Sequence, residues 1–388
     1  MLALPSDSRP EALTICFPFA GDSIGGSHHS VLGLLRQLDR DRFRPLVVTE
    51  VPGGRIARMF AEFAPVADPG ANSVPVAPGQ PYSLAKFTRT LTGLPARVRL
   101  LKAEQVGIVH SNDGRTHAAW GLPARLARVP LLWHHRADPS ALGLRLAAPL
   151  LATRVLTVSS FSLPPRGWWS AAHKSEVVHS PFDTAISVDR ADARARLLAE
   201  LDLRPDTLIL GYFGSLVPRK RPFVFVDAAV RLQDLIRRPV AGLMFGEAKN
   251  PAFGASLQER MAQPDARECV RLMGVRPDGA SWIGGCDQLI VPAVREPFGR
   301  TLIEAMLVGT PVIAAESGGN VEALQGGLGR LVKPDDPAAL AEASAELANA
   351  PHDAAALAQR ARQAALQRFG EERHAERVSQ IYAELAAR

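Results

Sequence analysis

The amino-acid sequence predicts an α/β protein made of two doubly wound domains, each built on a parallel sheet. Short runs rich in valine, isoleucine and leucine alternate with longer stretches of helical period. The short runs contain few polar residues, as expected of strands covered by helices on both faces. This alternation of strand and helix patterns is interrupted once and then resumes. The chain has 388 residues, a length that suits two or three domains.

The first half of the chain contains six expected strands separated by helical stretches. The expected strands are Leu13–Phe19, Pro45–Val51, Gly107–Ser111, Pro130–Trp133, Arg154–Ser159 and Glu176–His179. The expected helices include Ser30–Leu38, Ser83–Ala103 and His117–Arg128. A repeating order of strand, helix and strand favours a parallel sheet, because parallel strands need a crossover connection between them.

The alternation restarts after residues 180–206, which are polar and contain no strand run. The expected strands of the second half are Leu208–Phe213, Gly242–Phe245, Val270–Met273, Gln288–Val291, Pro311–Ala314 and Arg330–Val332. The expected helices are Pro222–Leu235, Gly254–Gln263, Thr301–Val308 and Pro337–Leu347, followed by one long helical pattern over Ala354–Arg388. We therefore expect domains over residues 1–185 and 186–365, and a helix over 366–388 that packs back toward the first domain.

Composition excludes several other classes of protein. Apolar residues make up 47% and charged residues 22%, which argues against a disordered or disulfide-rich chain. The net charge of +6 is mild for this length and does not support specific nucleic-acid binding. Cys16, Cys269 and Cys286 form no C-x-x-C pair, and no secretion signal or membrane-spanning run is evident. These features predict a cytoplasmic location.

The most specific segment is EPFGRTLIE, residues 296–304, at an expected junction of strand, turn and helix. Free amides at a helix N-terminus suit a phosphate, and Gly299 lets the backbone approach a ligand closely. The amides of Thr301 and Leu302 would then meet a diphosphate. The Glu304 carboxylate suits the two hydroxyls of a ribose, because its two oxygens can accept paired hydrogen bonds.

Glu296 precedes the turn and is placed to reach the hydroxyls of a second sugar. On spacing alone, Glu296 could equally be a loop charge and Glu304 an exposed helix residue. The whole segment, however, resembles the E-x7-E signature of retaining glycosyltransferases of the GT-B architecture, family 4 or group 1. The resemblance includes Phe298 in its opening, and it continues in SGGNVE at 317–322 and GRLVKPDD at 329–336.

This resemblance implies the GT-B fold, in which two Rossmann-like domains face a central cleft. It implies retaining transfer of a sugar from a nucleotide-diphosphate sugar, with Glu296, His134 and Lys220 as catalytic residues. It also implies that Phe298 and Gly299 contribute to the donor site. No metal is expected, and no ligand-spaced cluster of histidine, cysteine and carboxylate residues stands in the sequence.

A second motif, GYFGSLVPRK over residues 211–220, ends the first expected strand of the second domain. Gly214 opens the turn, and Arg219 and Lys220 are cations suited to a nucleotide diphosphate. The same residues are also compatible with a basic surface loop. Lys220 matches the lysine of the family pattern, but Ser215 stands where the family usually has arginine. The resemblance therefore leaves open whether Arg219 replaces that arginine.

Two further groups of residues follow expected strands in the first domain. Gly25 and Gly26 lie in a strand-to-helix turn, where the family carries a Gly-Gly pair near the donor phosphate or the acceptor. His134 matches a cleft histidine of the family, and the adjacent His135 and Arg136 are expected on the acceptor side. Without the resemblance, a histidine at a strand end indicates only a hydrogen-bonded residue.

The loop that begins at His110 resembles the family's loop near the acceptor. We expect His110, Asn112 and Asp113 on the acceptor side, although a simple polar turn explains them equally well. Trp168 and Trp169 form an aromatic pair that is either part of the core or a membrane-interface feature.

The sequence thus predicts a glycosyltransferase that uses no cofactor beyond a nucleotide-sugar donor. The expected acceptor is a saccharide or a lipid-linked sugar in the synthesis of a bacterial surface polysaccharide or glycolipid. Peripheral association with the inner face of the membrane is a further expectation, because basic residues favour anionic surfaces. Two alternatives remain at this point, a sugar-nucleotide epimerase of the same architecture and a non-catalytic module that binds a nucleotide sugar.

Overall fold

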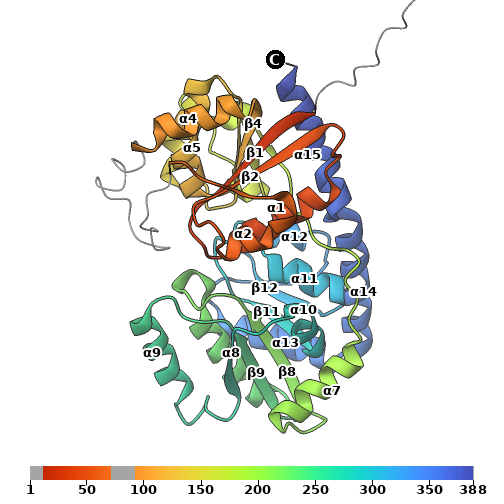
Figure 1. The fold of residues 1–388 in the computed structure, drawn as a ribbon. Helices are drawn as coiled ribbons and strands as arrows, with labels where there is room; N and C mark the ends of the chain where they lie inside the picture. The colour runs from red at the N-terminus through yellow and green to blue at the C-terminus, as the bar shows by residue number, and fades with distance from the viewer. Residues whose placement is uncertain (1–11, 71–91, 388) are drawn as a thin grey trace, which may run out of the picture. The chain divides into compact units, whose positions relative to one another are not determined.

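The computed structural model describes residues 12–70 and 92–387 (Figure 1). The chain divides into two compact units. The first unit comprises Met1–Val158, Leu163–Val178 and Glu371–Arg388, and the second comprises Ser159–Ser162 and His179–Gly370. The sequence predicts divisions at 185/186 and 365/366, which lie a few residues away. Of the expected helix Ser83–Ala103, residues 83–91 lie outside the described part of the chain.

The first unit contains a parallel sheet whose described strands occur in the order typical of doubly wound proteins. The order is β3 (Val66–Ala67), β2 (Phe43–Thr49), β1 (Leu13–Phe19), β4 (Val106–Ser111), β5 (Leu131–His135), β6 (Arg154–Thr157) and β7 (Ser175–Val177). The direction of winding reverses between β1 and β4. Ligands of such sheets bind beyond the carboxyl ends of the strands at this switch point.

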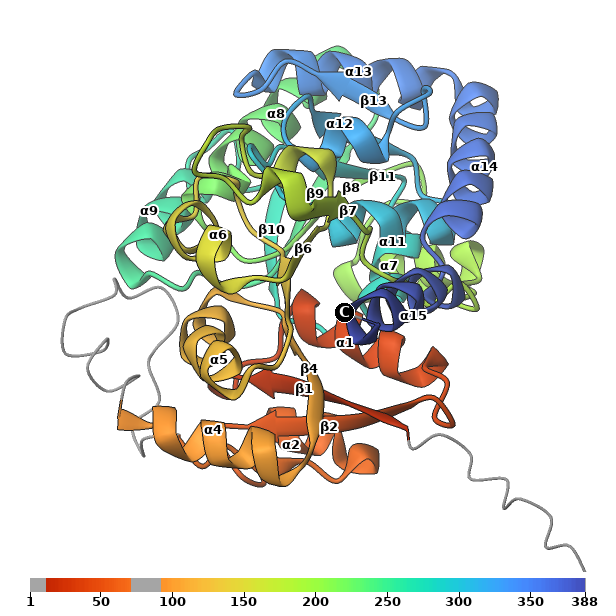
Figure 2. The same cartoon turned by 90° about the horizontal axis from the view of Figure 1, so that it is seen from above.

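Helices cover both faces of the first sheet, which explains the continuous apolar character of its strands. Ile15 and Phe17 pack toward the α1 and α15 side, whereas Cys16 packs toward α4, α5 and α6. Figure 2 shows α15 beside α1. The helices are α1 (Gly26–Gln37), α2 (Arg55–Met59), η1 (Ala61–Phe63), α4 (Leu94–Ala103), α5 (Gly114–Ala127), η2 (Gly143–Ala147), α6 (Ala148–Leu151), η4 (Ala172–Lys174) and α15 (Glu371–Ala386).

The second unit repeats the same design. Its described strands follow the order β10 (Val270–Gly274), β9 (Val240–Phe245), β8 (Leu208–Phe213), β11 (Gln288–Val291), β12 (Val312–Ala315) and β13 (Arg330–Val332). All neighbouring strands are parallel. The switch point of this sheet therefore lies between β8 and β11.

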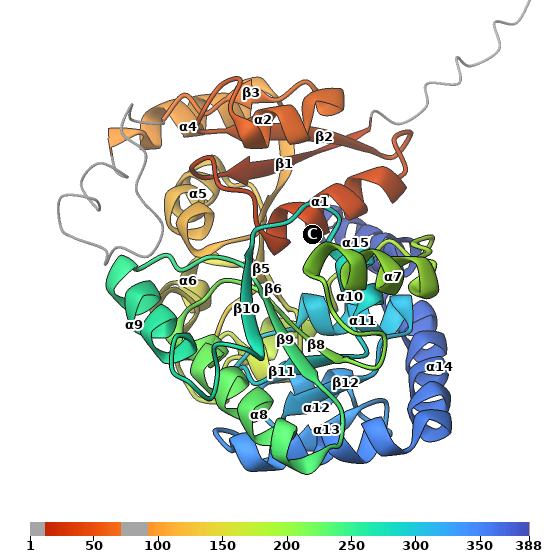
Figure 3. The ribbon, with the colours of Figure 1, turned by 90° about the horizontal axis from the view of Figure 1, so that it is seen from below.

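Alternate residues of β8 divide the second core into two layers, because side chains on a strand point to opposite faces in turn. Leu208 and Leu210 pack toward α8 and α13, and Ile209 packs toward α7. Figure 3 labels these three helices around the second sheet. The helices are α7 (Arg190–Leu201), α8 (Pro222–Leu235), α9 (Pro251–Met261), α10 (Gly279–Gly285), α11 (Arg300–Val308), α12 (Gly319–Ala323), α13 (Pro337–Asn349) and α14 (Pro351–Arg368), with short 3-10 turns η3 (Ser160–Ser162) and η5 (Pro218–Lys220).

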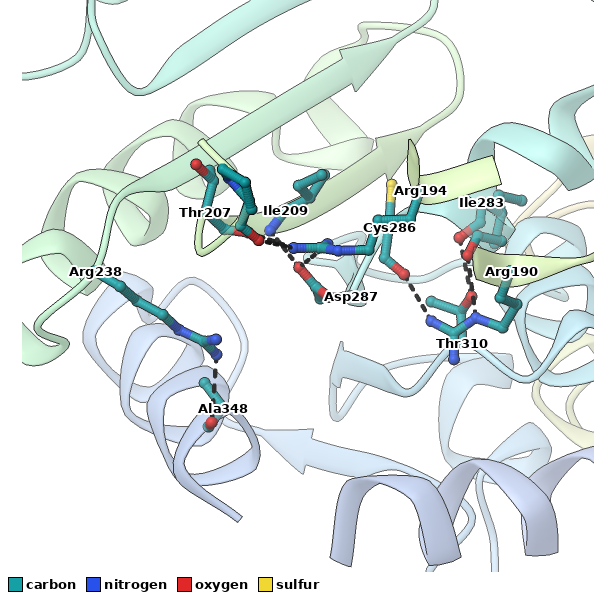
Figure 4. Close-up of polar contacts among 12 residues, drawn as sticks. Arg190, Arg194, Thr207, Ile209, Arg238, Ile283, Cys286, Asp287, Thr310 and Ala348 are labelled. Atoms are coloured by element: carbon teal, nitrogen blue, oxygen red, sulfur yellow. Dashed lines mark hydrogen bonds and ion pairs between the residues drawn. The ribbon is translucent and has the colours of Figure 1, made fainter. Parts of the chain in front are cut away.

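A polar network fixes α7 to the amino ends of β8 and β11 (Figure 4). The Arg194 guanidinium donates to Asp287 Oδ2 at 2.7 Å, and the same oxygen accepts a hydrogen bond from the Ile209 amide at 2.7 Å. Arg190 donates to the Cys286 carbonyl at 2.8 Å. These bonds hold the two strands together at one end, so that their other ends present two loops in a fixed relation.

The carboxyl-terminal tail differs from the prediction of one continuous helix. It forms two helices, α14 and α15, which are separated at Phe369 and Gly370. The Phe369 carbonyl accepts a hydrogen bond from the Phe182 amide at 2.9 Å, and the buried Phe369 ring packs against Phe182 and Phe298. This pairing takes the Phe369 carbonyl out of the helical pattern, and so the prediction of a single helix is wrong. Within the described residues, no helix has the length and apolar character needed to cross a membrane.

Gly246 allows the ends of β8 and β9 to approach closely. Its φ is +141°, and a Cβ atom there would lie 2.0 Å from the Gly214 carbonyl oxygen. We predict that Gly246→Ala lowers the free energy of unfolding by about 2 kcal/mol or more, measured by urea denaturation. Gly279→Ala is the matched control, because nothing lies within 4 Å of the corresponding Cβ position. Equal stability of the two variants would contradict this account.

Candidate functional site

The predicted donor residues of the second unit come together at the switch point of its sheet. β8 ends at Phe213 and is followed by the turn at Gly214, and β11 ends at Val291 and is followed by the loop that contains Glu296. These two strands are direct neighbours, so both loops leave the same edge of the sheet side by side. This is the edge at which doubly wound sheets bind their ligands.

Two cations and one carboxylate form the centre of this site. The Arg219 guanidinium donates to Oε2 of Glu296, and the Lys220 ammonium lies 3.6 Å from the same oxygen. Glu296 is largely buried, whereas Arg219 and Lys220 are partly exposed. One carboxylate faces two cations, so the cluster keeps a surplus of positive charge that suits an anionic ligand.

Backbone contacts determine the positions of these charges. Gly214 adopts a φ of +142°, and a Cβ atom there would lie 3.0 Å from Lys220 Nζ. The Val294 amide donates to the Arg219 carbonyl at 3.0 Å, which joins the two loops. Gly319 donates its amide to the Glu296 carbonyl at 2.7 Å. The cluster is therefore held from both strands and from the start of α12.

A pocket opens beside the cluster, entirely within the second unit. Its walls come from the ends of β8 and β11 and from the first turn of α11. The lining residues are Tyr212, Phe213, Lys220, Ile290, Val291, Pro292, Ala293, Glu296, Gly299 and Thr301. Gly299 is the N-cap of α11, and among the described residues no side chain caps this helix. The pocket thus combines charged side chains with a helix N-terminus, which is a favourable place for a phosphate.

Glu304 lies one turn further along α11 and is partly buried. Its Oε1 is 3.7 Å from Arg300 Nε. Burial raises the pKa of Glu304, and the charges of Arg300 and Lys220 oppose that rise. Glu304 therefore interacts electrostatically with Lys220 as well as with Arg300.

The side chains of Phe298 and Leu302 lie in the core. The Phe298 ring stacks on His179 at a centroid distance of 5.4 Å and contacts Phe369 at 5.5 Å. Leu302 is fully buried. Phe298 therefore packs the loop in place, and Leu302 has only its backbone amide to offer a ligand.

A hydrogen-bonded chain of aromatic residues occupies the predicted acceptor region of the first unit. The Tyr382 hydroxyl lies 2.6 Å from His110 Nδ1, and His110 Nε2 lies 3.2 Å from His134 Nδ1. The Arg136 guanidinium also reaches His134 Nδ1 at 3.2 Å. All three ring systems are buried.

These contacts assign the protons of both imidazoles. Arginine only donates, so His134 Nδ1 accepts and the His134 proton lies on Nε2. His110 Nε2 must then donate to His134 Nδ1, and His110 Nδ1 accepts from the Tyr382 hydroxyl. Among residues 12–70 and 92–387, His134 Nε2 has no hydrogen-bond partner. His134 therefore presents a buried, neutral N–H donor.

The other predicted residues of the first unit have defined structural contacts. Asn112 Oδ1 accepts from Arg136 at 3.1 Å, which places Arg136 between Asn112 and His134. Asp113 is the N-cap of α5 and accepts from the amides of Arg115 and Thr116. The His135 ring turns away from His134, and its Nε2 lies 3.1 Å from the Asp138 carbonyl oxygen.

Gly25 and Gly26 begin α1, with Gly25 as its N-cap. A Cβ atom at Gly25 would meet nothing within 4 Å, so open space lies beside this turn. The Gly25 amide is paired with His28 Nδ1 at 3.1 Å.

Comparison with known proteins identifies the second unit. The family model described as glycosyl transferases group 1 matches residues 194–364, which include β8, β11 and α11. Residues 194–364 therefore form a domain of the group 1 glycosyltransferase type.

Curated relatives match part of the chain. A D-inositol 3-phosphate glycosyltransferase of Streptomyces scabiei is 33% identical over 224 residues, 54% of this chain and 48% of the relative. The lipopolysaccharide core biosynthesis mannosyltransferase LpsB of Rhizobium meliloti is 32% identical over 151 residues, 37% of this chain and 42% of the relative. The chain thus spans about half the length, or less, of the curated relatives that it matches.

Solved structures share the fold over nearly the whole chain. Anabaena Alr3699/HepE in complex with UDP and glucose has a TM-score of 0.79 at 22% identity, covering 96% of this chain and 99% of that chain. The lipopolysaccharide outer core galactosyltransferase WaaB in its apo form has a TM-score of 0.70 at 15% identity, covering 96% and 100%. These similarities confirm the predicted GT-B fold with two Rossmann-like domains.

The second unit also contains a polar contact that the sequence does not predict. His179 Nε2 lies 2.6 Å from Glu322 Oε1, and the Ser160 amide donates to Glu322 Oε2 at 2.6 Å. Although burial opposes ionisation, the hydrogen bonds from His179 and Ser160 hold the pKa of Glu322 below its usual value. Glu322 therefore ties η3 and the start of the second unit to α12.

Sequence reasoning also missed Tyr382 and His374, the α15 residues that reach the histidine cluster. His374 stacks on His134 at a centroid distance of 6.0 Å. The available signal was the buried face of α15, on which His374, Val378 and Tyr382 recur at intervals of four residues. In the described residues, no group of three or more histidine, cysteine or carboxylate side chains is placed to hold a metal.

The buried histidines predict a pH-dependent stability. Burial, followed by neighbouring positive charge, holds the pKa of His110, His117 and His134 well below 6.5. Below the pKa that these histidines have in the unfolded chain, they bind protons in the unfolded state but stay neutral in the folded state. The free energy of unfolding therefore falls as the pH drops through that pKa. At about one pH unit below that pKa, each buried histidine lowers the free energy of unfolding by about 1 kcal/mol.

The measurement is the free energy of unfolding in urea at about pH 7.5 and about pH 5.5. His134→Asn should reduce the loss of stability on acidification by about 1 kcal/mol. His352→Gln, at an exposed position of α14, should leave the loss unchanged. A wild-type protein equally stable at both pH values would contradict the burial of neutral imidazoles.

Proposed function

We propose that this protein transfers a sugar, with retention of anomeric configuration, from a nucleotide-diphosphate sugar to a saccharide or lipid-linked acceptor. The proposal rests most directly on the cluster of Arg219, Lys220 and Glu296 at the N-terminus of α11 within a group 1 domain. This arrangement supplies cations and free amides where a leaving diphosphate needs them.

Arg219, Lys220 and the first amides of α11 hold the diphosphate. Breakage of the bond between sugar and phosphate leaves an additional negative charge on the diphosphate. Preorganised donors aimed at that charge stabilise the transition state without a reorganisation cost. Because two side-chain cations and a helix dipole serve this purpose, we propose that transfer needs no divalent metal.

The two glutamates bind hydroxyl groups on either side of the diphosphate. Glu304 accepts from the ribose hydroxyls, since it lies on α11 beyond the phosphate-binding turn. Glu296 binds hydroxyls of the transferred sugar, and its pairing with Arg219 and Lys220 keeps its carboxylate oriented. In this proposal the acceptor hydroxyl attacks from the leaving-group side, and no protein side chain forms a covalent intermediate.

His134 holds the sugar through its Nε2–H. The assigned tautomer makes this atom a neutral donor, and a sugar hydroxyl would satisfy its unfilled hydrogen bond. His110 and Arg136 keep the ring in this tautomer. The ring is buried, so contact with a sugar requires the residues around it to move.

Relatives support the classes of donor and acceptor that we propose. Anabaena HepE has been solved with UDP-glucose, and LpsB of Rhizobium meliloti is a mannosyltransferase of lipopolysaccharide core biosynthesis. We propose a comparable role in bacterial surface polysaccharide or glycolipid synthesis, with the enzyme in the cytoplasm at the inner face of the membrane.

One observation favours a second candidate function, that of a non-catalytic module that binds nucleotide sugars. Ser215 stands at the usual place of a diphosphate arginine, and its carbonyl accepts from the Tyr212 hydroxyl at 3.4 Å. If Arg219 does not replace that arginine, the site has one diphosphate cation fewer than its relatives. Binding without transfer would then be the expected behaviour.

We predict that one nucleotide sugar among UDP-, GDP- and ADP-linked donors raises the melting temperature of the protein, with or without EDTA. Binding to the folded state alone stabilises it in proportion to the logarithm of ligand concentration over Kd. Lys220→Met should weaken binding of that donor by about tenfold or more in calorimetry. Glu296→Gln should abolish transfer.

Lys249→Met is the matched control, because Lys249 is an exposed lysine of the same unit outside the pocket. Its donor affinity should equal that of the wild type. Full transfer activity in both Lys220→Met and Glu296→Gln would rule out the proposed site, and loss of binding in EDTA would contradict metal independence.

An arginine at position 215 should compensate for the loss of Arg219 in donor binding. Arg219→Ala should weaken donor binding by about tenfold or more, because a charge-assisted contact is lost. Adding Ser215→Arg to that variant should recover most of the affinity, measured by calorimetry with the selected donor. Unchanged affinity in Arg219→Ala would show that Arg219 is not a diphosphate ligand.

A further inference from the structure

A row of leucines on the first unit faces solvent. Leu142, Leu146 and Leu150 follow one another at intervals of four residues along η2 and α6, so they share one helical face. Their exposed fractions are 71%, 60% and 56%. Leu144 and Ala148, on the opposite face, are buried in the core. This short helical segment is therefore apolar on both sides, although only one side is covered.

Two exposed tryptophans lie in another segment of the same unit. Trp168 is 96% exposed and Trp169 is 44% exposed, and their ring centroids are 5.9 Å apart. The segment that carries them is fastened to α6, because Lys174 Nζ donates to the Pro149 carbonyl at 2.8 Å and to the Ala152 carbonyl at 2.6 Å. The tryptophans and the leucine row thus belong to neighbouring elements of one unit.

Basic residues accompany the apolar ones, and Asp138 is the one aspartate or glutamate between residues 114 and 175. Arg145 lies between Leu142 and Leu146 in the chain, Arg166 precedes the tryptophans, and both are exposed. Arg125, also exposed, lies on α5, which packs against α6 (Figure 2). Residues 114–137 and 139–175 contain no aspartate or glutamate.

Exposed leucines and tryptophans next to arginines are more favourable at the surface of a lipid bilayer than in water. A tryptophan that is almost fully exposed leaves a large apolar ring in contact with solvent, and the membrane interface is the environment such rings prefer. Leucines on one helical face can enter the acyl boundary, and arginines can pair with lipid phosphates. A two-fold dimer through the same surface would bring together two copies of a surface that is rich in arginine and poor in carboxylates.

We propose that Leu142, Leu146, Leu150, Trp168 and Trp169, with Arg125, Arg145 and Arg166, form a surface that binds an anionic lipid bilayer. We call it the α6 surface. The inference deepens the membrane association proposed above by assigning it to particular residues. It does not depend on the donor chemistry, so it can be tested without nucleotide sugar.

The test is co-sedimentation of the full chain with vesicles of phosphatidylcholine, with and without phosphatidylglycerol. The wild type should bind the anionic vesicles, and binding should weaken as salt is added. Trp168→Ala/Trp169→Ala should lower vesicle affinity by about tenfold or more, and Arg145→Gln/Arg166→Gln should do so as well. Tryptophan emission should shift to the blue on binding only while Trp168 and Trp169 are present.

The matched control is Leu235→Ser/Val275→Ser, which removes two exposed apolar residues from the second unit. It should bind vesicles as the wild type does. All variants should retain wild-type donor affinity in calorimetry without lipid, which separates failure of this surface from failure of the proposed transferase site.

Three results would overturn the proposal. The first is no sedimentation of the wild type with anionic vesicles. The second is binding that the tryptophan and arginine variants retain in full. The third is a wild-type dimer, seen by light scattering, that becomes a monomer in the tryptophan variant while vesicles bind neither form, because the α6 surface would then belong to a contact between copies of the chain.

Discussion

The pairing of one carboxylate with two cations at the ends of β8 and β11 is the constraint on which the candidate site depends. Without Glu296, the positive charges of Arg219 and Lys220 would repel each other beside a helix N-terminus that is itself positive. Without the cations, the negative charge of the largely buried Glu296 carboxylate would have no positive partner to offset its desolvation. Each side of the pair therefore explains why the other is tolerated, and the remaining positive charge defines the kind of ligand that can enter.

The fold makes this pairing possible by joining residues that lie far apart in sequence. Lys220 and Glu296 meet only because β8 and β11 are neighbours at the switch point of the sheet. Contacts of Asp287 at the opposite ends of these strands keep them together, and Gly214 leaves room for the Lys220 side chain. The contacts at the amino ends of β8 and β11 thus fix the positions of the loops at their carboxyl ends, where the candidate site lies.

The sequence predicts those parts of the structure whose signals are local. The apolar runs identify the strands, and the glutamate loop and Lys220 are recognisable because each motif is contiguous. Long-range contacts are not visible in this way. Tyr382 joins His110 across most of the chain, and Phe369 interrupts the last helical pattern because of its contact with Phe182. The packing of Phe298 could not be predicted for the same reason, because its aromatic partners His179 and Phe369 lie on distant segments of the chain.

The most direct measurement of the central claim is a crystal structure of the protein with UDP bound. The account predicts that the diphosphate lies at the start of α11, with its oxygens within hydrogen-bonding distance of Lys220, Arg219 and the first helical amides. It also predicts that the ribose reaches Glu304. A nucleotide bound elsewhere, or a diphosphate that contacts neither Lys220 nor Arg219, would contradict the account.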